Sequence, residues 1–291
     1  MSLLEIVKKV DNFTYGQPPS ELYTLVSHNG AQSLGYIVPL VAQELSRFKD
    51  VFVFTSKTIT IHHHLDTIDK RNQAFARVAS DLKQNGFIKG WRDELFTIYY
   101  PTHEPYLLVE RAFSPLLGIV MYGIHVNGYI PPHLSSDGEI KFWIPKRSKT
   151  KSTYPGMLDN TIGGGIGYPY GVFETVVKES YEEAGFDEGF IIKNTKAAGT
   201  VSYIFCDLET EYDQSIGLVQ PEVQYIYDLV CDETVAPKPI DNEAESFHLM
   251  TLKQVWENVV NGQFKPNCAL IIIDFLIRHG YITSETEQEY K

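Results

Sequence analysis

Three glutamates on one predicted helix are the residues of this chain best suited to metal chemistry. They are Glu179, Glu182 and Glu183, and they lie in residues 163–186, GGGIGYPYGVFETVVKESYEEAGF, where a glycine-rich loop leads into a helix that Gly185 closes. At about 100° per residue, the three carboxylates fall within an arc of about 100°. The apolar side chains that gather roughly opposite, and that we expect to face the core, are Phe173, Val177, Tyr181 and Ala184.

Three carboxylates on one helix face repel one another. Like charges three or four residues apart each destabilise a helix by roughly 0.2–0.5 kcal/mol, and carboxylates near the C-terminus oppose the macrodipole by about 0.3–1 kcal/mol each. A hard divalent cation, Mg²⁺ or the alternative Mn²⁺, turns this repulsion into coordination. From the glutamates alone, a solvated acidic face is the main alternative. A dinucleotide-binding loop is disfavoured, because no long parallel βαβ pattern surrounds the glycines.

The same segment resembles the Nudix box. The residues that match the box in register are Gly164, Glu179, Glu182, Glu183, Gly185 and Phe186. Three positions depart from it: Tyr170 replaces its first Glu, Lys178 replaces its Arg, and Ser180 replaces an apolar residue. In the box, the first Glu and the Arg would form an ion pair. We expect Glu174 and Lys178, which are i,i+4 in the favourable order, to replace that support.

What this resemblance implies is an α/β/α Nudix sandwich with a mixed sheet and a hydrolase dependent on Mg²⁺. Glu179, Glu182 and Glu183 would be both catalytic residues and metal ligands, and the backbone carbonyl of Gly163 a further ligand. Such ions lower the pKa of a bound water, which then attacks phosphorus. A carboxylate from a later loop commonly completes the site. The first choice is Glu243, in DNEAESF, and the next choices are Glu222 and Glu245.

Sequence outside the box narrows the resemblance. Residues 143–171, with 90–94 (GWRDE) and 124–129 (IHVNGY), are similar to two-domain Nudix proteins related in name to thiamine pyrophosphokinases. This implies cleavage of thiamine diphosphate, and especially of damaged or toxic analogues such as oxo- and oxythiamine diphosphate, to the monophosphate and phosphate. The alternatives are a Nudix pyrophosphatase of nucleoside diphosphate derivatives such as ADP-ribose, a catalytically silent diphosphate-binding module, and an isomerase on a related scaffold.

Basic residues precede the glycines. Residues 111–151 carry a net charge of +4, whereas residues 152–291 carry -15. Lys146, Arg147 and Lys151 lie where their side chains could reach phosphate oxygens of the substrate, and Arg147 and Lys151 are the first choices. The alternative is a solvated basic loop.

Two further side chains are candidates for substrate binding. His125 shares a strand face with Asn127 near the expected cleft. Trp91, beside the acidic Asp93 and Glu94, offers an aromatic surface to a cationic thiazolium ring. Ordinary packing is the alternative for both. The run of histidines at 62–64 is disfavoured as a metal site, because neighbours on a strand point to opposite faces.

Composition limits the partners. The net charge is -12, which argues against nucleic acid or anionic membrane, since both need clustered positive charge. We therefore expect a small-molecule diphosphate as the partner. No stretch approaches the roughly 18 apolar residues of a membrane span. The cysteines lack C-x-x-C spacing, and the first residues resemble neither a signal nor a transit peptide, so we expect a cytoplasmic protein.

The order of predicted elements indicates two domains. We expect a small N-terminal α+β domain over residues 1–110, with a candidate role in substrate recognition, and a Nudix domain over residues 111–291. Asn127-Gly128 is predicted to form a bend or bulge. Helices are predicted over 3–10, 36–48, 66–84, 174–184, 252–261 and 269–279. Strands are predicted over 51–54, 58–62, 95–99, 106–109, 118–129, 141–144, 197–205, 222–230 and 247–251.

Overall fold

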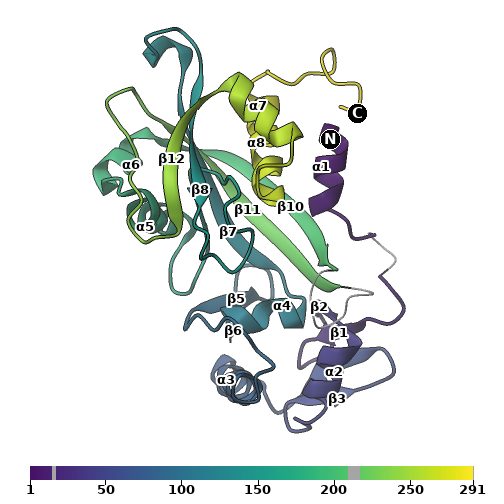
Figure 1. Cartoon of the computed structure of the whole chain (residues 1–291). Helices are drawn as coiled ribbons and strands as arrows, with labels where there is room; N and C mark the ends of the chain where they lie inside the picture. Colours follow the sequence, from purple (N-terminus) through teal and green to yellow (C-terminus); the bar gives the residue numbers. More distant parts are fainter. Residues whose placement is uncertain (15–17, 209–216, 291) are drawn as a thin grey trace.

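The computed structural model describes residues 1–14, 18–208 and 217–290, and its centre is a mixed sheet (Figure 1). The strand order is β10-β11-β7-β8-β12, and β9 also pairs with β7. Only β7 and β11 run parallel among these pairs. The strands are β7 (Met121–Ile130), β8 (Lys141–Arg147), β9 (Ile162–Gly165), β10 (Thr195–Asp207), β11 (Leu218–Val230) and β12 (Ala244–Thr251).

Helices cover both faces of this sheet, as Figure 1 shows. On one face α5 (Val172–Ala184) and α6 (Glu188–Asn194) pack against Ile124, Val126 and Leu229. On the other face the core includes Phe142 and Ile144 from β8. The helices there are α1 (Leu3–Val10), α7 (Leu252–Val260) and α8 (Pro266–Arg278). The predicted mixed sheet with helices on both sides is therefore confirmed.

A smaller α+β part lies below the sandwich and has its own core. Its two sheets have the strand orders β2-β1-β4-β3 and β5-β6. The strands are β1 (Tyr23–Val26), β2 (Ser33–Ile37), β3 (Phe52–Phe54), β4 (Thr58–Ile61), β5 (Leu95–Tyr99) and β6 (Pro105–Glu110). The helices are α2 (Pro39–Leu45), α3 (Ile68–Gln84) and α4 (Ser114–Leu117). Cys206, Leu218 and Val219, from the far ends of β10 and β11, complete this core.

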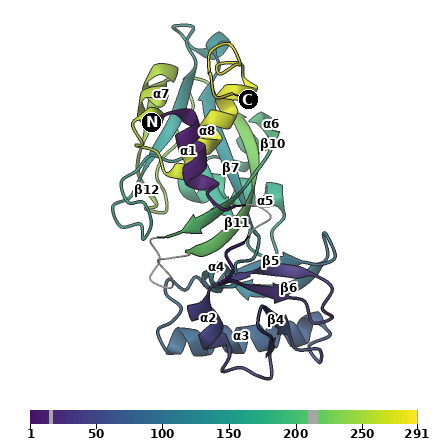
Figure 2. The ribbon, with the colours of Figure 1, turned by 90° about the vertical axis from the view of Figure 1, so that its right-hand side faces the viewer.

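The first helix does not pack with the small sheets that follow it in sequence. α1 lies beside α8 (Figure 2), and Leu3 and Ile6 join the core of the large sheet. The chain therefore begins in the large part of the fold, passes through the small part, and then returns to the large part. None of the described helices combines the length and the apolar run that crossing a bilayer requires.

The predicted helix over 36–48 is wrong at its start. Tyr36 and Ile37 belong to β2, and α2 begins only at Pro39. Proline disfavours helical geometry in the residue before it, and Val38 is accordingly extended, with φ -72° and ψ 153°. The other predicted helices are confirmed with small shifts of their ends.

The bend or bulge predicted at Asn127-Gly128 is also wrong. Both residues pair in regular register with β11. Glycine is needed here for a close approach instead, because a Cβ would lie 2.9 Å from Thr161 Cγ2. The Gly128 N–H donates to Thr161 Oγ1 at 2.7 Å.

Candidate metal and catalytic site

The site lies where the sheet divides. β8 pairs with β7 at Tyr129 and Ile130, whereas β9 pairs with the same edge of β7 at Gly123–Val126. The chain between β8 and β9 lies where these two strands separate, and a cavity of about 20 Å³ opens there. It is large enough for one ion or water molecule. Its lining includes Arg147, Asp159, Asn160, Glu183 and Glu243.

α5 carries the glutamates and ends at Gly185, which has φ 66° as predicted. The buried side of this helix differs from the prediction. Tyr181 is 65% exposed and Phe173 is 38% exposed. The buried residues are Thr175, Val176, Ser180 and Ala184. The helix is turned so that its small side chains, and not its aromatic ones, meet the sheet, which brings the neighbouring glutamate face inward.

The strand of glycines makes room for two of these carboxylates. The Gly163 N–H donates to Glu183 Oε2 at 3.0 Å. A Cβ on Gly164 would lie 2.7 Å from Glu179 Cδ, so only glycine leaves Glu179 in place. Burial raises the pKa of Glu179, and it raises that of Glu183 well above its ordinary value. Both carboxylates therefore lie in a setting that a cation would stabilise.

A loop from the far end of the sheet brings further carboxylates to Glu183. Carboxylate oxygens of Glu183, Asp241 and Glu243 lie within 4.8 Å of one another. The Lys238 N–H donates to Ala184 O at 2.9 Å, which fixes this loop over the end of α5. The donors are all hard oxygens, the type that Mg²⁺ and Mn²⁺ prefer. Sequence reasoning named Glu243 but missed Asp241, two residues earlier in the same acidic run.

Lys178 does not pair with Glu174, so that prediction is wrong. Glu174 Oε2 instead accepts the Gly171 N–H at 2.8 Å and caps the start of α5. Lys178 Nζ binds Glu179 Oε1 at 2.9 Å and Glu182 Oε2 at 2.8 Å. The Glu182 side chain is 47% exposed and lies outside the carboxylate group around Glu183. Lys178 thus partly neutralises the glutamate face.

The predicted phosphate-binding residues are engaged with protein groups. Arg147 Nη1 pairs with Asp159 Oδ2 at 2.5 Å, and its other donors reach backbone carbonyls of residues 153 and 154. Lys151 Nζ lies 2.6 Å from Glu243 Oε2. Lys146 Nζ lies 3.6 Å from Glu245 Oε2. The fold thus brings Arg147 and Lys151 to the site, and their binding of substrate stays a prediction.

The other two candidates lie in different surroundings. His125 is buried and faces Gly163, whose Cβ would be 3.4 Å from His125 Nδ1. Burial lowers the pKa of His125 to about 4. Trp91 packs against the small core, with Lys83 Nζ 4.1 Å from the centroid of its ring. The face of Trp91 therefore already holds a cation.

Residues of the smaller part reach the glycine loop, which sequence reasoning missed. The Tyr168 N–H donates to Leu95 O at 2.7 Å. A Cβ on Gly165 would lie 2.6 Å from Phe96 Cζ. Arg111 Nη1 pairs with Glu94 Oε2 at 2.7 Å. Glu94 was visible in the sequence as an acid beside Trp91, but only the fold shows that it adjoins the loop.

Comparison with known proteins identifies relatives along almost the whole chain. Residues 4–121 match a family model described as a domain of unknown function, DUF4743. The "Uncharacterized protein YJR142W" of Saccharomyces cerevisiae is 39% identical over 99% of this chain and 88% of its own. "Nudix hydrolase 20, chloroplastic" of Arabidopsis thaliana is 35% identical over 89% of this chain and 72% of its own.

A second Arabidopsis relative, "Nudix hydrolase 24, chloroplastic", is 36% identical over the same shares of the two chains. A solved MutT protein from Methanosarcina mazei Go1 covers 47% of this chain and 81% of its own, at 16% identity and a TM-score of 0.34. A cytoplasmic location for this chain stays a prediction, since both plant relatives are named chloroplastic. The long matches to the plant proteins show that the chain belongs to the Nudix hydrolases, enzymes that generally use divalent metal ions, and that it hydrolyses diphosphate bonds.

Proposed function

We propose that this enzyme cleaves thiamine diphosphate, and especially its damaged or toxic analogues such as oxo- and oxythiamine diphosphate, to the monophosphate and phosphate. The observation that carries the chemistry is the convergence of Glu183, Asp241 and Glu243 within 4.8 Å, beside the glycine strand. An all-oxygen group of this kind suits Mg²⁺. The similarity of residues 90–94, 124–129 and 143–171 to thiamine-related Nudix proteins carries the choice of substrate.

The residues proposed to hold Mg²⁺ are Glu179, Glu182, Glu183, Glu243 and the Gly163 carbonyl, joined by Asp241. When bound, the ion lowers the pKa of a water molecule and neutralises charge on the leaving phosphate. Glu179 and Glu183 are the two partly buried carboxylates of α5 whose pKa values are raised, and either can accept the proton of the attacking water. Lys178 binds both Glu179 and Glu182, so Glu182 must leave this ion pair in order to reach the ion.

Residues 1–110, apart from α1, which packs on the large sheet, are proposed to recognise the organic part of the substrate. Glu94 adjoins the glycine loop, and Arg111 both pairs with it and lies over the buried ring of Phe96. A cationic thiazolium ring would be attracted by the Glu94 carboxylate. Arg111, paired with Glu94, supplies a positive charge on the phosphate side, alongside Arg147 and Lys151. This distribution of charge favours a substrate with a cationic head and an anionic tail.

Product analysis by ion-exchange chromatography tests the proposal. The substrates are thiamine diphosphate, oxythiamine diphosphate and ADP-ribose, each with Mg²⁺ and with chelator. We expect monophosphate and phosphate from the first two, only with Mg²⁺. Turnover of ADP-ribose alone would overturn the thiamine proposal. Glu94→Gln should raise the KM for thiamine diphosphate more than that for ADP-ribose, because only the thiamine substrate carries a cationic ring; Glu139→Gln, at an exposed acid, is the control.

A further inference from the structure

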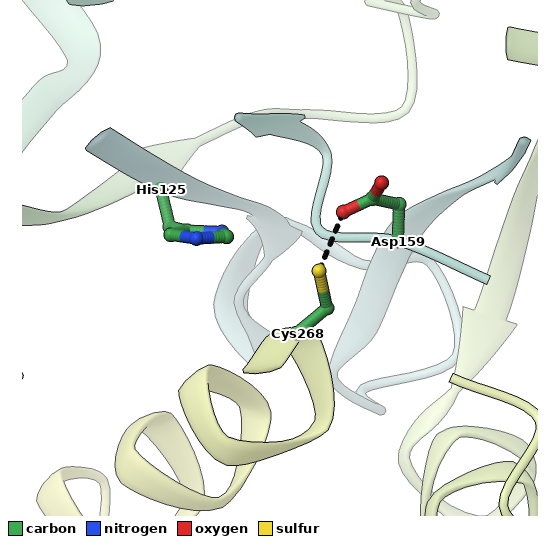
Figure 3. A group of neighbouring side chains, drawn as sticks. All are labelled: His125, Asp159 and Cys268. Atoms are coloured by element: carbon green, nitrogen blue, oxygen red, sulfur yellow. Dashed lines mark hydrogen bonds between the residues drawn. The ribbon is translucent and has the colours of Figure 1, made fainter. Parts of the chain in front are cut away.

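A second group of side chains suited to metal binding consists of His125, Asp159 and Cys268 (Figure 3). His125 comes from β7, Asp159 from the chain before β9, and Cys268 from the first turn of α8. One ligand atom from each lies within 4.8 Å of the other two. Because Ile124 and Val126 pack on the α5 side, His125 must point the other way. Three elements distant in sequence thus place a nitrogen, an oxygen and a sulfur together.

Burial leaves this group short of hydrogen-bond partners. His125 is 5% exposed and Cys268 is fully buried. Within the described residues His125 Nδ1 has no hydrogen-bond partner, and neither has Oδ1 of Asn160, the residue after Asp159. A buried polar atom without a hydrogen-bond partner destabilises the folded state. Figure 3 shows the imidazole, thiol and carboxylate directed toward one another, so a bound ion would satisfy the imidazole from inside the group.

We propose that His125, Asp159 and Cys268 bind one Zn²⁺ ion. Imidazole, thiolate and carboxylate are the protein ligands of zinc, whereas Mg²⁺ and Mn²⁺ prefer oxygen alone. In a tetrahedral zinc site, ligand atoms lie about 3.5 Å apart, which the observed spacing accommodates with small side-chain movements. This site differs in chemistry from the all-oxygen group around Glu183.

The contacts of Asp159 resemble those of a metal-ligating carboxylate. Its Oδ2 is held by Arg147 at 2.5 Å, while its Oδ1 lies 2.7 Å from Cys268 Sγ. An ion pair on the outer oxygen orients a ligand carboxylate and leaves the inner oxygen for the ion. On binding, Cys268 loses its proton to solvent and Zn²⁺ takes the place of that proton between sulfur and oxygen. Thiolate and carboxylate then offset the charge of the ion. Two cations lie nearby: Arg147, which pairs with Asp159, and Lys265, just before α8, whose charge acts on both Asp159 and Cys268.

The ion would join three parts of the scaffold: β7, the approach to the glycine strand, and α8. Its proposed role is structural, because none of its three ligands comes from α5, the helix that carries the glutamates. Zinc should therefore raise the midpoint of thermal unfolding, Tm, by binding only the folded state. This gives a readout that does not depend on hydrolysis.

Cobalt spectroscopy of the full chain, freed of metal with chelator and then dialysed, tests the proposal. We expect Co²⁺ to give a thiolate-to-cobalt charge-transfer band that saturates at one ion per chain, and Zn²⁺ to abolish it. Excess Mg²⁺ should leave the band unchanged. Cys268→Ser should lose it, whereas Cys231→Ser and Cys206→Ser, at buried cysteines outside the group, should retain it.

Two outcomes would overturn the proposal. One is that the wild-type chain shows no band, and the other is that Cys268→Ser shows the same band as the wild type. If Cys268→Ser does not fold, His125→Asn is used in its place and should bind Co²⁺ more weakly than the wild type. In that case Zn²⁺ must still raise the Tm of the wild-type chain. The histidines at 62–64 carry no sulfur, so they cannot produce the thiolate-to-cobalt band. Glu183→Gln should keep the cobalt band while losing hydrolysis, so failure of one site is distinguishable from failure of the other.

Discussion

The backbone N–H of Gly163 donates to the carboxylate of Glu183 at 3.0 Å, and this bond joins the glycine strand to the glutamate helix. It holds a buried carboxylate whose pKa burial raises well above its ordinary value. Neighbouring carboxylates, including Glu179 and Glu243, add to that increase. Glu183 is thus fixed in position before a cation arrives, so little reorganisation is needed on binding.

Glu183→Gln should abolish most of the activity. The amide keeps an oxygen that can accept the Gly163 N–H but removes the charge that a cation needs. We expect kcat to fall by about 100-fold or more, the scale of losing a proton-transfer group. Steady-state kinetics with Mg²⁺ measure this, and circular dichroism checks the fold.

Glu188→Gln, at an exposed acid in the first turn of α6, is the matched control for that change. It removes the same charge from the next helix without touching the carboxylate group. Its kcat should match that of the wild type. Equal rates in Glu183→Gln and Glu188→Gln would remove Glu183 from the mechanism.

Gly164→Ala should displace Glu179. The added Cβ would lie 2.7 Å from Glu179 Cδ, closer than real Cβ contacts allow, so the carboxylate must move. A misplacement of this size lowers kcat by on the order of 10- to 100-fold. Gly189→Ala, within α6, is the control, because its Cβ would meet Asp187 Oδ1 at 3.0 Å and none of the carboxylates proposed to bind metal. An equal kcat for Gly164→Ala and Gly189→Ala would contradict the steric argument.

Periodicity and turn chemistry predicted most elements, because they are local properties of the chain. The helix over 174–184 and its end at Gly185 followed from spacing alone. The buried side of that helix did not, since apolar side chains were expected to face inward. A strand of glycines accepts a helix through small side chains such as Ser180, and this leaves Tyr181 in solvent.

Local sequence patterns did not predict the contacts between segments that are distant in sequence. Asp159 is an ordinary acid in the sequence, and it gains its significance from Arg147 and Cys268, which the fold brings to its two oxygens. Lys178 was expected to bind Glu174, because both lie on one helix face. The Glu174 carboxylate instead accepts the backbone N–H of Gly171 at the start of the helix. The rule for i,i+4 pairs describes helix interiors and does not include this capping bond.

Arg147→Ala should destabilise the protein strongly. It leaves the buried Asp159 carboxylate without its ion pair and frees the carbonyls of residues 153 and 154. Breaking a buried ion pair from one side lowers the free energy of unfolding by about 3–5 kcal/mol. Urea denaturation measures this. Lys149→Ala, at an exposed residue of the same segment, should change it by less than about 0.5 kcal/mol; a similarly small effect of Arg147→Ala would show that the pair contributes little.

His125 should make the metal-free protein less stable as the pH falls. Its pKa is about 4 in the folded state, lowered by burial, against 6.5 for an ordinary histidine. Below pH 6.5 the unfolded chain therefore binds a proton that the folded chain excludes, so stability that is fully present above pH 6.5 is lost toward pH 4. The loss attributable to this group approaches about 3 kcal/mol. Urea denaturation with chelator from pH 7.5 to 4.5 measures this loss of stability. The loss should occur in the wild type and in His133→Gln, at an exposed histidine, but the part due to His125 should be absent in His125→Gln. Parallel pH profiles of the wild type and His125→Gln would mean that His125 gains its proton in the folded state as readily as in the unfolded chain.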